Sequence, residues 1–345
     1  MEYRIEKQLL HFKQPAGTSR GVYLTRKIWL IKLFDGEHQG VGECAPLPDL
    51  SCDAMGDEKY ASILNKVCED CCKSGEIDYA FLRDYPSMLF GLETALLDLQ
   101  ASHLSPLTSH LLIDTAFSRG EVGIPINGLV WMGNYEEMLQ RMEEKLEKGF
   151  RCVKLKIGAI DFDKELDLIK KIRSRFSFHE VELRLDANGA FHYDEALYKL
   201  ELLSQYNIHS IEQPIRQGQW AYMAELCRES PLPIALDEEL IGVNDAEMKR
   251  HMLNVIKPRY IILKPSLHGG MMGCREWINI AKDMGIGSWI TSALESNIGL
   301  NAIAQFASSI YGDNITMPQG LGTGQLFTDN IPMPLEIRGD QLWHL

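Results

Sequence analysis

The feature that most constrains the fold is a series of five short apolar segments that each end in charged residues. They follow one another at intervals of about 25 to 30 residues: CVKLKIG with Lys154 and Lys156, ELRLDANG with Asp186, SIEQPI with Glu212, IALDEEL with Asp237, and IILKPS with Lys264. Buried charges are costly unless they pair or bind a metal. A repeating strand-helix unit has this spacing, and in a barrel it brings the strand ends together. We therefore expect these residues to form an active site.

The wider pattern predicts two kinds of structure. Over the first 120 residues, expected strands at 3–9 and 22–34 precede expected helices at 58–73 and 87–103, which is typical of a separate α+β domain. From residue 124 a strand-loop-helix pattern repeats, with eight candidate strands from INGLV to PQGLGTG. We predict an α+β capping domain over 1–120, a TIM-like (β/α) barrel over 121–325, and a tail over 326–345 that returns to the capping domain.

Composition excludes several classes of function. The formal net charge of −13 argues against a nucleic-acid partner, because lysine and arginine contacts to phosphate dominate that binding. No apolar stretch approaches the roughly 20 residues that span a bilayer. The first residues, MEYRIEKQLLHFKQ, lack the apolar core of a signal peptide. We expect a cytoplasmic protein without a membrane or nucleic-acid partner, and the sequence gives no oligomeric state.

The three acidic strand ends indicate a metal site. Asp186, Glu212 and Asp237 would converge at one end of the barrel, where three carboxylates repel one another without a cation. Three oxygen ligands with no His or Cys suit Mg²⁺, or Mn²⁺, better than zinc. Each acid alone is equally well explained as a helix N-cap or a surface ion pair, so the prediction depends on all three together.

The lysines flank this predicted metal site. Lys154 and Lys156 are two residues apart on one strand and therefore share a face. Two ammonium groups beside a dication lower each other's pKa, and a neutral lysine is a general base. The alternative is a lysine pair on an exposed edge strand. It conflicts with the apolar residues Val153, Leu155 and Ile157, which alternate with the two lysines. Lys264 enters from the opposite side, as a second base or as a fixed cation.

Two further polar residues lie close to the predicted ligands. Asn188 and Glu238 are candidates to support the metal ligands through hydrogen bonds, or are ordinary loop and helix-start residues. A base beside a divalent cation suggests removal of a proton alpha to a carboxylate, with the metal stabilising the resulting enediolate.

These residues together resemble the enolase superfamily, in particular its muconate-lactonizing-enzyme subgroup. A lysine base beside Mg²⁺ is a known pattern of that superfamily. The resemblance implies an enolase-type modified barrel with an N-terminal capping domain. It also implies that Lys156 is the base, that Lys264 lies across the site, and that Asp186, Glu212 and Asp237 are metal ligands.

Four segments narrow the resemblance within the subgroup: GECAPLPDLS, ILKPSLHGG, SALESNIGL and GLGTGQLFTDNI. They are most similar to members that dehydrate a succinyl-hydroxycyclohexadiene-carboxylate to o-succinylbenzoate in menaquinone biosynthesis. The resemblance implies a small carboxylate substrate with a succinyl tail. Expected substrate contacts are Lys154, Ser296, Gly322, Thr323, Gly324 and Arg20. The glycines and Ser296 are otherwise ordinary barrel turns.

Other activities of the same site stay open. An N-succinylamino acid racemase would use both lysines as bases on opposite faces. A dipeptide epimerase typically carries an acidic pair at the eighth strand, and this chain has no acid from Gly320 to Phe327. Muconate cycloisomerase fits less well because the tail-binding signature differs. A barrel that binds metal without catalysis would usually lack one of these residues, and all are present.

Overall fold

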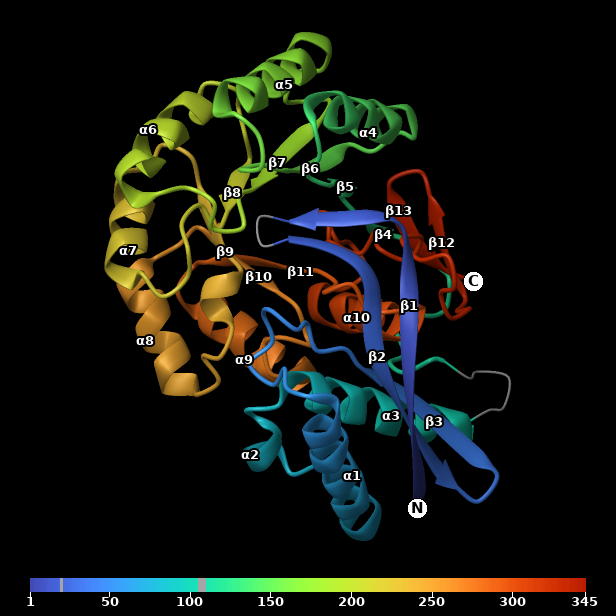
Figure 1. Cartoon of the computed structure of the whole chain (residues 1–345). Helices are drawn as coiled ribbons and strands as arrows, with labels where there is room; N and C mark the ends of the chain where they lie inside the picture. The colour runs from blue at the N-terminus through green and yellow to red at the C-terminus, as the bar shows by residue number, and fades with distance from the viewer. Residues whose placement is uncertain (19–20, 105–109) are drawn as a thin grey trace.

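The structure is a computed structural model that describes residues 1–18, 21–104 and 110–345 (Figure 1). Its first part is a three-stranded antiparallel sheet in the order β1-β2-β3, accompanied by helices. The elements are β1 (Glu2–Thr18), β2 (Gly21–Asp35), β3 (His38–Cys44), α1 (Asp57–Ser74), α2 (Tyr79–Leu82) and α3 (Pro86–Leu104). The expected α+β character of this part, here called the cap, is confirmed.

The cap sheet is larger than the sequence pattern predicts. Strand β1 extends to Thr18, far beyond the predicted 3–9, because it pairs with β2 from Glu2↔Phe34 to Thr18↔Gly21. Strand β3 is not predicted at all, and its glycines explain it. A Cβ at Gly42 would lie 1.8 Å from the Gly91 carbonyl oxygen of α3, so only glycine lets this strand touch that helix.

The second part is a parallel sheet whose seven strands follow in chain order from β5 to β11. The strands are β5 (Gly128–Val130), β6 (Cys152–Lys156), β7 (Glu182–Asp186), β8 (Ser210–Glu212), β9 (Ile234–Leu236), β10 (Tyr260–Leu263) and β11 (Gly287–Ile290). The helices that alternate with them are α4 (Tyr135–Glu147), α5 (Phe162–Arg175), α6 (Tyr193–Ser204), α7 (Trp220–Glu229), α8 (Ala246–Ile256), α9 (Gly270–Asp283) and α10 (Asn297–Tyr311). Figure 1 shows helices α4 to α8 as an outer arc around the strands. The predicted (β/α) barrel is confirmed.

The eighth predicted strand forms only single bridges. The segment PQGLGTG reaches both edges of the sheet, through Ile126↔Gln319 and Thr291↔Gly320, and so closes the barrel. The chain passes very close to Thr291, since a Cβ at Gly320 would lie 1.9 Å from the Thr291 hydroxyl. Glycine-rich sequence permits this approach but gives no side chain that would support a regular strand.

Alternation along the strands decides what faces the barrel interior. In β6, Val153 and Leu155 are buried in the apolar core that the strands share with the surrounding helices. The residues that alternate with them, Lys154 and Lys156, point to the other face, toward the barrel axis. The apolar residues thus anchor the strand and leave the lysines inside.

The last part of the chain contacts both preceding parts. Residues 326–329 lie against β1, where Phe12 and Phe327 form a bridge and the His11 backbone N–H donates to Asp329 at 2.8 Å. The expected strands of the tail are β12 (Leu335–Arg338) and β13 (Gln341–His344), and β13 pairs with β4 (Ile124–Pro125). The domain boundaries themselves stay a prediction. Within the described ranges, no helix combines the length and apolar character needed to cross a membrane.

Candidate active site

Six charged side chains meet at the C-terminal ends of the barrel strands. Lys154 and Lys156 come from β6, Asp186 ends β7, Glu212 ends β8, and Asp237 and Lys264 directly follow β9 and β10. The hydrogen-bond register places Lys156 opposite Asp186 and Asp186 opposite Glu212. All three acids are almost completely buried. The convergence that the sequence spacing predicts is therefore present.

The two lysines of β6 both bind the acid of the next strand. Lys156 Nζ lies 2.8 Å and Lys154 Nζ lies 2.9 Å from Asp186 Oδ2. Lys154 Nζ is also 2.5 Å from Glu212 Oε2. One carboxylate oxygen thus faces two ammonium groups, and Lys154 connects two neighbouring strand ends.

Lys264 enters from the far side of the cluster. Its ammonium group donates to Asp237 Oδ2, and its backbone N–H donates to His268 Nδ1 at 2.8 Å. Burial, together with Lys264, lowers the pKa of His268 to about 3, although Asp237 opposes the shift. His268 is therefore neutral, as its accepting Nδ1 requires. It fixes the start of the turn that carries Lys264.

The protonation states follow from this pairing. Burial alone would raise the pKa of Asp186, but the attraction of Lys154 and Lys156 outweighs it and the pKa is lowered. Burial would lower the pKa of Lys154 and of Lys264, yet the adjacent carboxylates raise both. For Lys154 this is opposite to the prediction that the two ammonium groups lower each other's pKa. The attraction of Asp186 and Glu212, which both contact Lys154, outweighs that repulsion. Burial and then Asp186 raise the pKa of Glu212 well above its usual value.

The acids have the chemistry of a hard-cation site, although lysines lie among them. Glu212 Oε1 and Asp237 Oδ1 are buried and have no hydrogen-bond partner in the part of the chain that the structure describes. Across the same described residues, no three His, Cys, Asp or Glu side chains lie together in an arrangement ready to hold a metal. The lysine contacts explain this spacing, because Lys154 binds two of the acids and Lys264 binds the third. The donor set fits Mg²⁺, with oxygen ligands only.

Asn188 and Glu238 form hydrogen bonds next to the cluster. Lys156 Nζ donates to Asn188 Oδ1 at 2.6 Å, and Asn188 Nδ2 donates to Glu238 Oε1 at 2.9 Å. The Asn188 backbone N–H also donates to Asp186 Oδ1 at 3.0 Å. The amide of Asn188 is thereby oriented, and its oxygen binds Lys156.

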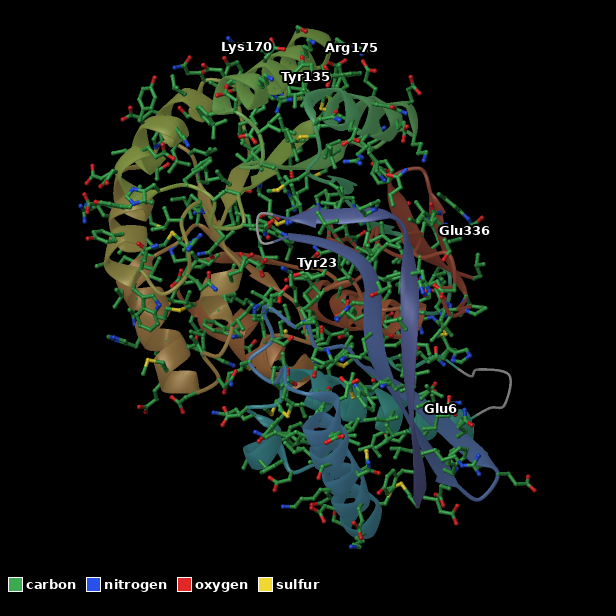
Figure 2. All side chains as sticks on the ribbon, viewed as in Figure 1. Glu6, Tyr23, Tyr135, Lys170, Arg175 and Glu336 are labelled. Carbon is green, nitrogen blue, oxygen red and sulfur yellow. The ribbon has the colours of Figure 1, made fainter. Side chains whose placement is uncertain are left out.

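A cavity of about 80 Å³ lies beside the cluster and is lined from both parts of the chain. The cap contributes Tyr23, Leu47 and Leu50. Figure 2 shows Tyr23 near the end of the long β1–β2 hairpin, over the middle of the barrel. The barrel contributes the three lysines and an apolar wall: Lys154, Lys156, Lys264, Leu129, Trp131, Ala293 and Leu294. A cavity of about 270 Å³ elsewhere is lined by none of the six charged residues, so volume alone does not mark the site.

Comparison with known proteins agrees with this geometry. The family model described as "Enolase C-terminal domain-like" matches residues 137–339, and the model "MenC, N-terminal domain" matches residues 19–99. The o-succinylbenzoate synthase of Desulfotalea psychrophila is 45% identical, over 99% of this chain and 98% of that protein. The chain belongs to the MenC family of the enolase superfamily.

Two further comparisons bear on the MenC family assignment. The crystal structure of MenC from Desulfotalea psychrophila superimposes with a TM-score of 0.83 at 41% identity and covers 99% of each chain. The N-succinylamino acid racemase of Thermus thermophilus is 29% identical, over 82% of this chain and 75% of that protein. Enolase superfamily enzymes use divalent metal ions, generally Mg²⁺.

The residues predicted to contact a MenC substrate do not all lie at the cavity. Lys154, Gly322 and Thr323 line the cavity, and the Thr323 hydroxyl is buried with no hydrogen-bond partner among the described residues. Gly324 instead packs against Asn297, whose Oδ1 would lie 2.8 Å from a Cβ at that position. Arg20 lies outside the described residues.

Ser296 is not among the residues that line the cavity, and its expected substrate contact stays a prediction from the sequence. It is fully buried, it caps α10 by accepting from the Ile298 backbone N–H, and its hydroxyl donates to Glu43 of the cap. Ser292, earlier in the same SALES segment, lines the cavity instead.

Several residues of the site are missed by sequence reasoning. The Trp131 ring lies 5.6 Å from Lys156 Nζ, which is a cation–π distance. Gln213 is fully buried, donates to Glu239 at 3.0 Å and accepts from the Asp237 backbone N–H at 3.3 Å. Gln213 could have been identified from the sequence, because it is a polar residue directly after a buried strand-end acid. No sequence feature identifies Tyr23 or Leu47, because only the docking of the cap brings them to the site.

Proposed function

We propose that this protein is an o-succinylbenzoate synthase, which removes water from a succinyl-hydroxycyclohexadiene-carboxylate and leaves an aromatic ring. The single observation that carries the proposal is the pair Lys156 and Lys264 on opposite sides of three buried strand-end carboxylates. The full-length similarity to an o-succinylbenzoate synthase supports the choice among reactions that begin with an alpha proton.

Lys156 is the proposed base. Asp186 and Asn188 hold its Nζ at 2.8 and 2.6 Å, so the amine has a fixed direction. A neutral Lys156 takes the proton alpha to the substrate carboxylate, and the electrons of that C–H bond become part of the ring system. The ammonium then returns the proton to the departing hydroxyl group, which leaves as water. Lys156 is thus restored in each cycle.

Lys264 is proposed to act as a cation. Its ion pair with Asp237 favours the protonated form and raises its pKa. A permanent positive charge across the ring from Lys156 stabilises the negative charge that spreads over the substrate after proton removal. We expect it also to make a cation–π contact with the product ring.

Asp186, Glu212 and Asp237 are proposed to hold Mg²⁺, and Mn²⁺ takes similar ligands. When bound, the ion supplies further stabilisation of charge on the substrate carboxylate. The unpartnered oxygens of Glu212 and Asp237 support this assignment.

The rest of the cavity suits the remainder of the substrate. Its apolar residues, Trp131 and Leu294 among them, offer a surface for the ring. The buried hydroxyl of Thr323 and the backbone at Gly322 are proposed to hold the succinyl tail. A contact from Arg20, a direct contact from Lys154, and the cytoplasmic location stay predictions from the sequence.

The test is turnover of the succinyl-hydroxycyclohexadiene-carboxylate with Mg²⁺, followed by loss of diene absorbance with and without a chelator. We expect conversion that the chelator stops and that added Mg²⁺ restores. Lys156→Ala should remove it, while Lys170→Ala, which changes an exposed lysine of α5, should not (Figure 2). If the substrate is untouched while N-succinylamino acids are racemised, the activity is that of the racemase to which the chain is also similar.

The roles of the two lysines are separated by two variants. Lys264→Arg keeps a positive charge and should keep part of the activity, whereas a lysine that acts as a base would not tolerate it. Lys156→Ala should also stop hydrogen–deuterium exchange at the alpha carbon. Persistent exchange in that variant would assign the base to another residue.

A further inference from the structure

One wall of the site is a short barrel segment that the cap holds in place. Ser292, Ala293 and Leu294 follow β11, and all three line the cavity beside the lysines. Leu294 has a φ of 67°, in the left-handed region that a branched side chain rarely adopts. Such a residue persists only where its surroundings hold it.

Arg26 binds backbone carbonyl groups of this segment. It lies on β2 of the cap and is 3% exposed. Its Nε donates to the Leu294 carbonyl at 3.1 Å, and its Nη2 donates to the Ala293 carbonyl at 3.3 Å. The same guanidinium donates to the carbonyls of Ala45 and, at 2.6 Å, Pro46. One side chain thus joins the segment after β3 of the cap to the segment after β11 of the barrel.

Glu43 binds backbone amides of the same region. It is the penultimate residue of β3, is fully buried, and accepts from the Ser296 backbone N–H at 2.8 Å and the Gly299 backbone N–H at 2.9 Å. It also accepts from the Ser296 hydroxyl. A carboxylate at the N-terminus of α10 is favourable because the first amides of a helix lack partners.

The barrel's own contacts bind other atoms of the segment: the Ser292 backbone N–H donates to the Gly320 carbonyl at 3.1 Å, and the Ser266 hydroxyl donates to Glu295. Glu295 Oε2 accepts from the Ser292 hydroxyl and the Ala293 backbone N–H, each at 2.7 Å. None of these contacts reaches the carbonyl oxygens on which the orientation of the Leu294 peptide depends. Those oxygens are bound by Arg26.

We propose that Arg26 and Glu43 are positioning residues for the reaction, which fix the Ala293–Ser296 segment so that Leu294 and Ala293 form the substrate-facing wall. The guanidinium of Arg26 donates to carbonyl oxygens and the carboxyl group of Glu43 accepts from amide groups, so the two side chains hold opposite ends of one turn. The cap therefore shapes the pocket through the barrel's backbone as well as through its own Tyr23 and Leu47. This inference rests on the proposed function only for its kinetic test, since the hydrogen-exchange test needs no substrate.

The first experiment combines kinetics with hydrogen exchange. In Arg26→Met we expect kcat/KM for the succinyl-hydroxycyclohexadiene-carboxylate to fall by roughly 10²-fold, mostly as a higher KM, because the wall contacts the non-reacting part of the substrate. Exchange of the amides in residues 292–299 should become at least about tenfold faster. Arg4→Met, which changes an exposed arginine of the same sheet, is the matched control and should alter neither.

A second experiment tests the strained turn itself. Leu294→Gly and Leu294→Ala both remove the side chain, but only glycine adopts a φ of 67° without strain. If Arg26 holds that turn, Arg26→Met should reduce kcat/KM several-fold less in the glycine background than in the alanine background. Equal losses in the two backgrounds would overturn the proposal.

Glu43→Gln is the variant to use if Arg26→Met does not fold. It keeps the shape of the side chain but places a donor where two amides and a hydroxyl donate, so the exchange of residues 292–299 should again rise. Unchanged exchange and unchanged KM in folded protein would reduce both residues to a purely structural role. If the wild type does not turn over the substrate, the proposed function fails, and hydrogen exchange alone still decides whether the pair holds the segment.

Discussion

The two ends of the barrel strands hold buried charge in opposite ways. Here the lower end is the N-terminal end of the strands, and the upper end is the C-terminal end, where the candidate active site lies. Strand β7 sends Glu182, Arg184 and Asp186 to the inner face. In the lower half, Arg184 donates to Glu182 at 2.7 Å and to the Pro318 carbonyl at 2.9 Å, and it lies 4.4 Å from the Trp289 ring. Only its Nη2 lacks a hydrogen-bond partner among the described residues.

The upper end carries three carboxylates in one buried cluster. Asp186 is satisfied by two lysines, but Glu212 Oε1 and Asp237 Oδ1 have no partner in the described part of the chain. We therefore expect the charges at the lower end mainly to stabilise the fold. The unpartnered carboxylate oxygens at the upper end should lower its stability but serve the reaction. Four predictions test that contrast.

The largest effect should come from Glu212→Gln at the upper end. Loss of one proposed metal ligand should lower kcat by about 10³-fold, since a bound metal would supply several kcal/mol of charge stabilisation. The free energy of unfolding should stay the same or rise by about 1 kcal/mol, because burial and Asp186 disfavour the ionised Glu212. Turnover and urea unfolding measure the two quantities. A clear loss of stability would contradict the contrast.

Arg184→Met at the lower end should do the reverse. It leaves Glu182 without its cation and removes the contact with the Trp289 ring, so the free energy of unfolding should fall by about 3 kcal/mol. Below the unfolding temperature kcat should stay within about twofold of wild type, since Arg184 lines no part of the cavity. A large loss of kcat in folded protein would show that the two ends are coupled.

The double variant Arg184→Met/Glu182→Gln tests whether the stability lost in Arg184→Met comes from the unpaired charge of Glu182. With both charges removed, no uncompensated ion remains, and most of the stability lost in the single variant should return, to within about 1 kcal/mol of wild type. A double-mutant cycle by urea unfolding gives the coupling energy of the pair. Simple additivity of the two single losses would mean that the pair does not act as a unit.

The smallest effect concerns His209, which lies below the site and stacks on Tyr260 with ring centroids 5.0 Å apart. Burial and Arg184 lower its pKa, although Glu182 opposes them. The folded chain therefore binds fewer protons than the unfolded chain, whose His pKa is about 6.5, and stability is lost as the pH falls below that value.

In His209→Gln, the decrease in Tm between roughly pH 7.5 and 5.5 should be about 1–2 °C smaller than in wild type. The exposed His179→Gln is the control for loss of a histidine. An unchanged pH dependence in His209→Gln would show that His209 does not contribute to it.

Much of the site follows from strand periodicity and spacing. Alternation with Val153 and Leu155 places Lys154 and Lys156 inside the barrel, and regular strand-helix units bring Asp186, Glu212, Asp237 and Lys264 to the same end. Predictions failed where long-range pairing overrides local pattern. The eighth strand is reduced to bridges, and β3 owes its place to glycines packed against a helix.

The contacts of Ser296 have a related cause. Its segment reads as a substrate-binding turn, but Glu43, more than 250 residues earlier, binds its hydroxyl and its backbone N–H. No periodicity in the sequence connects the two residues. The same holds for Tyr23 and Arg26, which reach the site only because the cap docks on the barrel.

The sequence by itself therefore determined the barrel, the inward direction of the lysines and the set of strand-end acids, because each depends on regular alternation and spacing along one chain segment. Tertiary structure alone decided which ammonium group binds which carboxylate, which serine faces the cavity, and how the cap fixes the turn at Leu294. Those choices depend on distances between segments far apart in the chain, and such distances are set only when the two parts pack together.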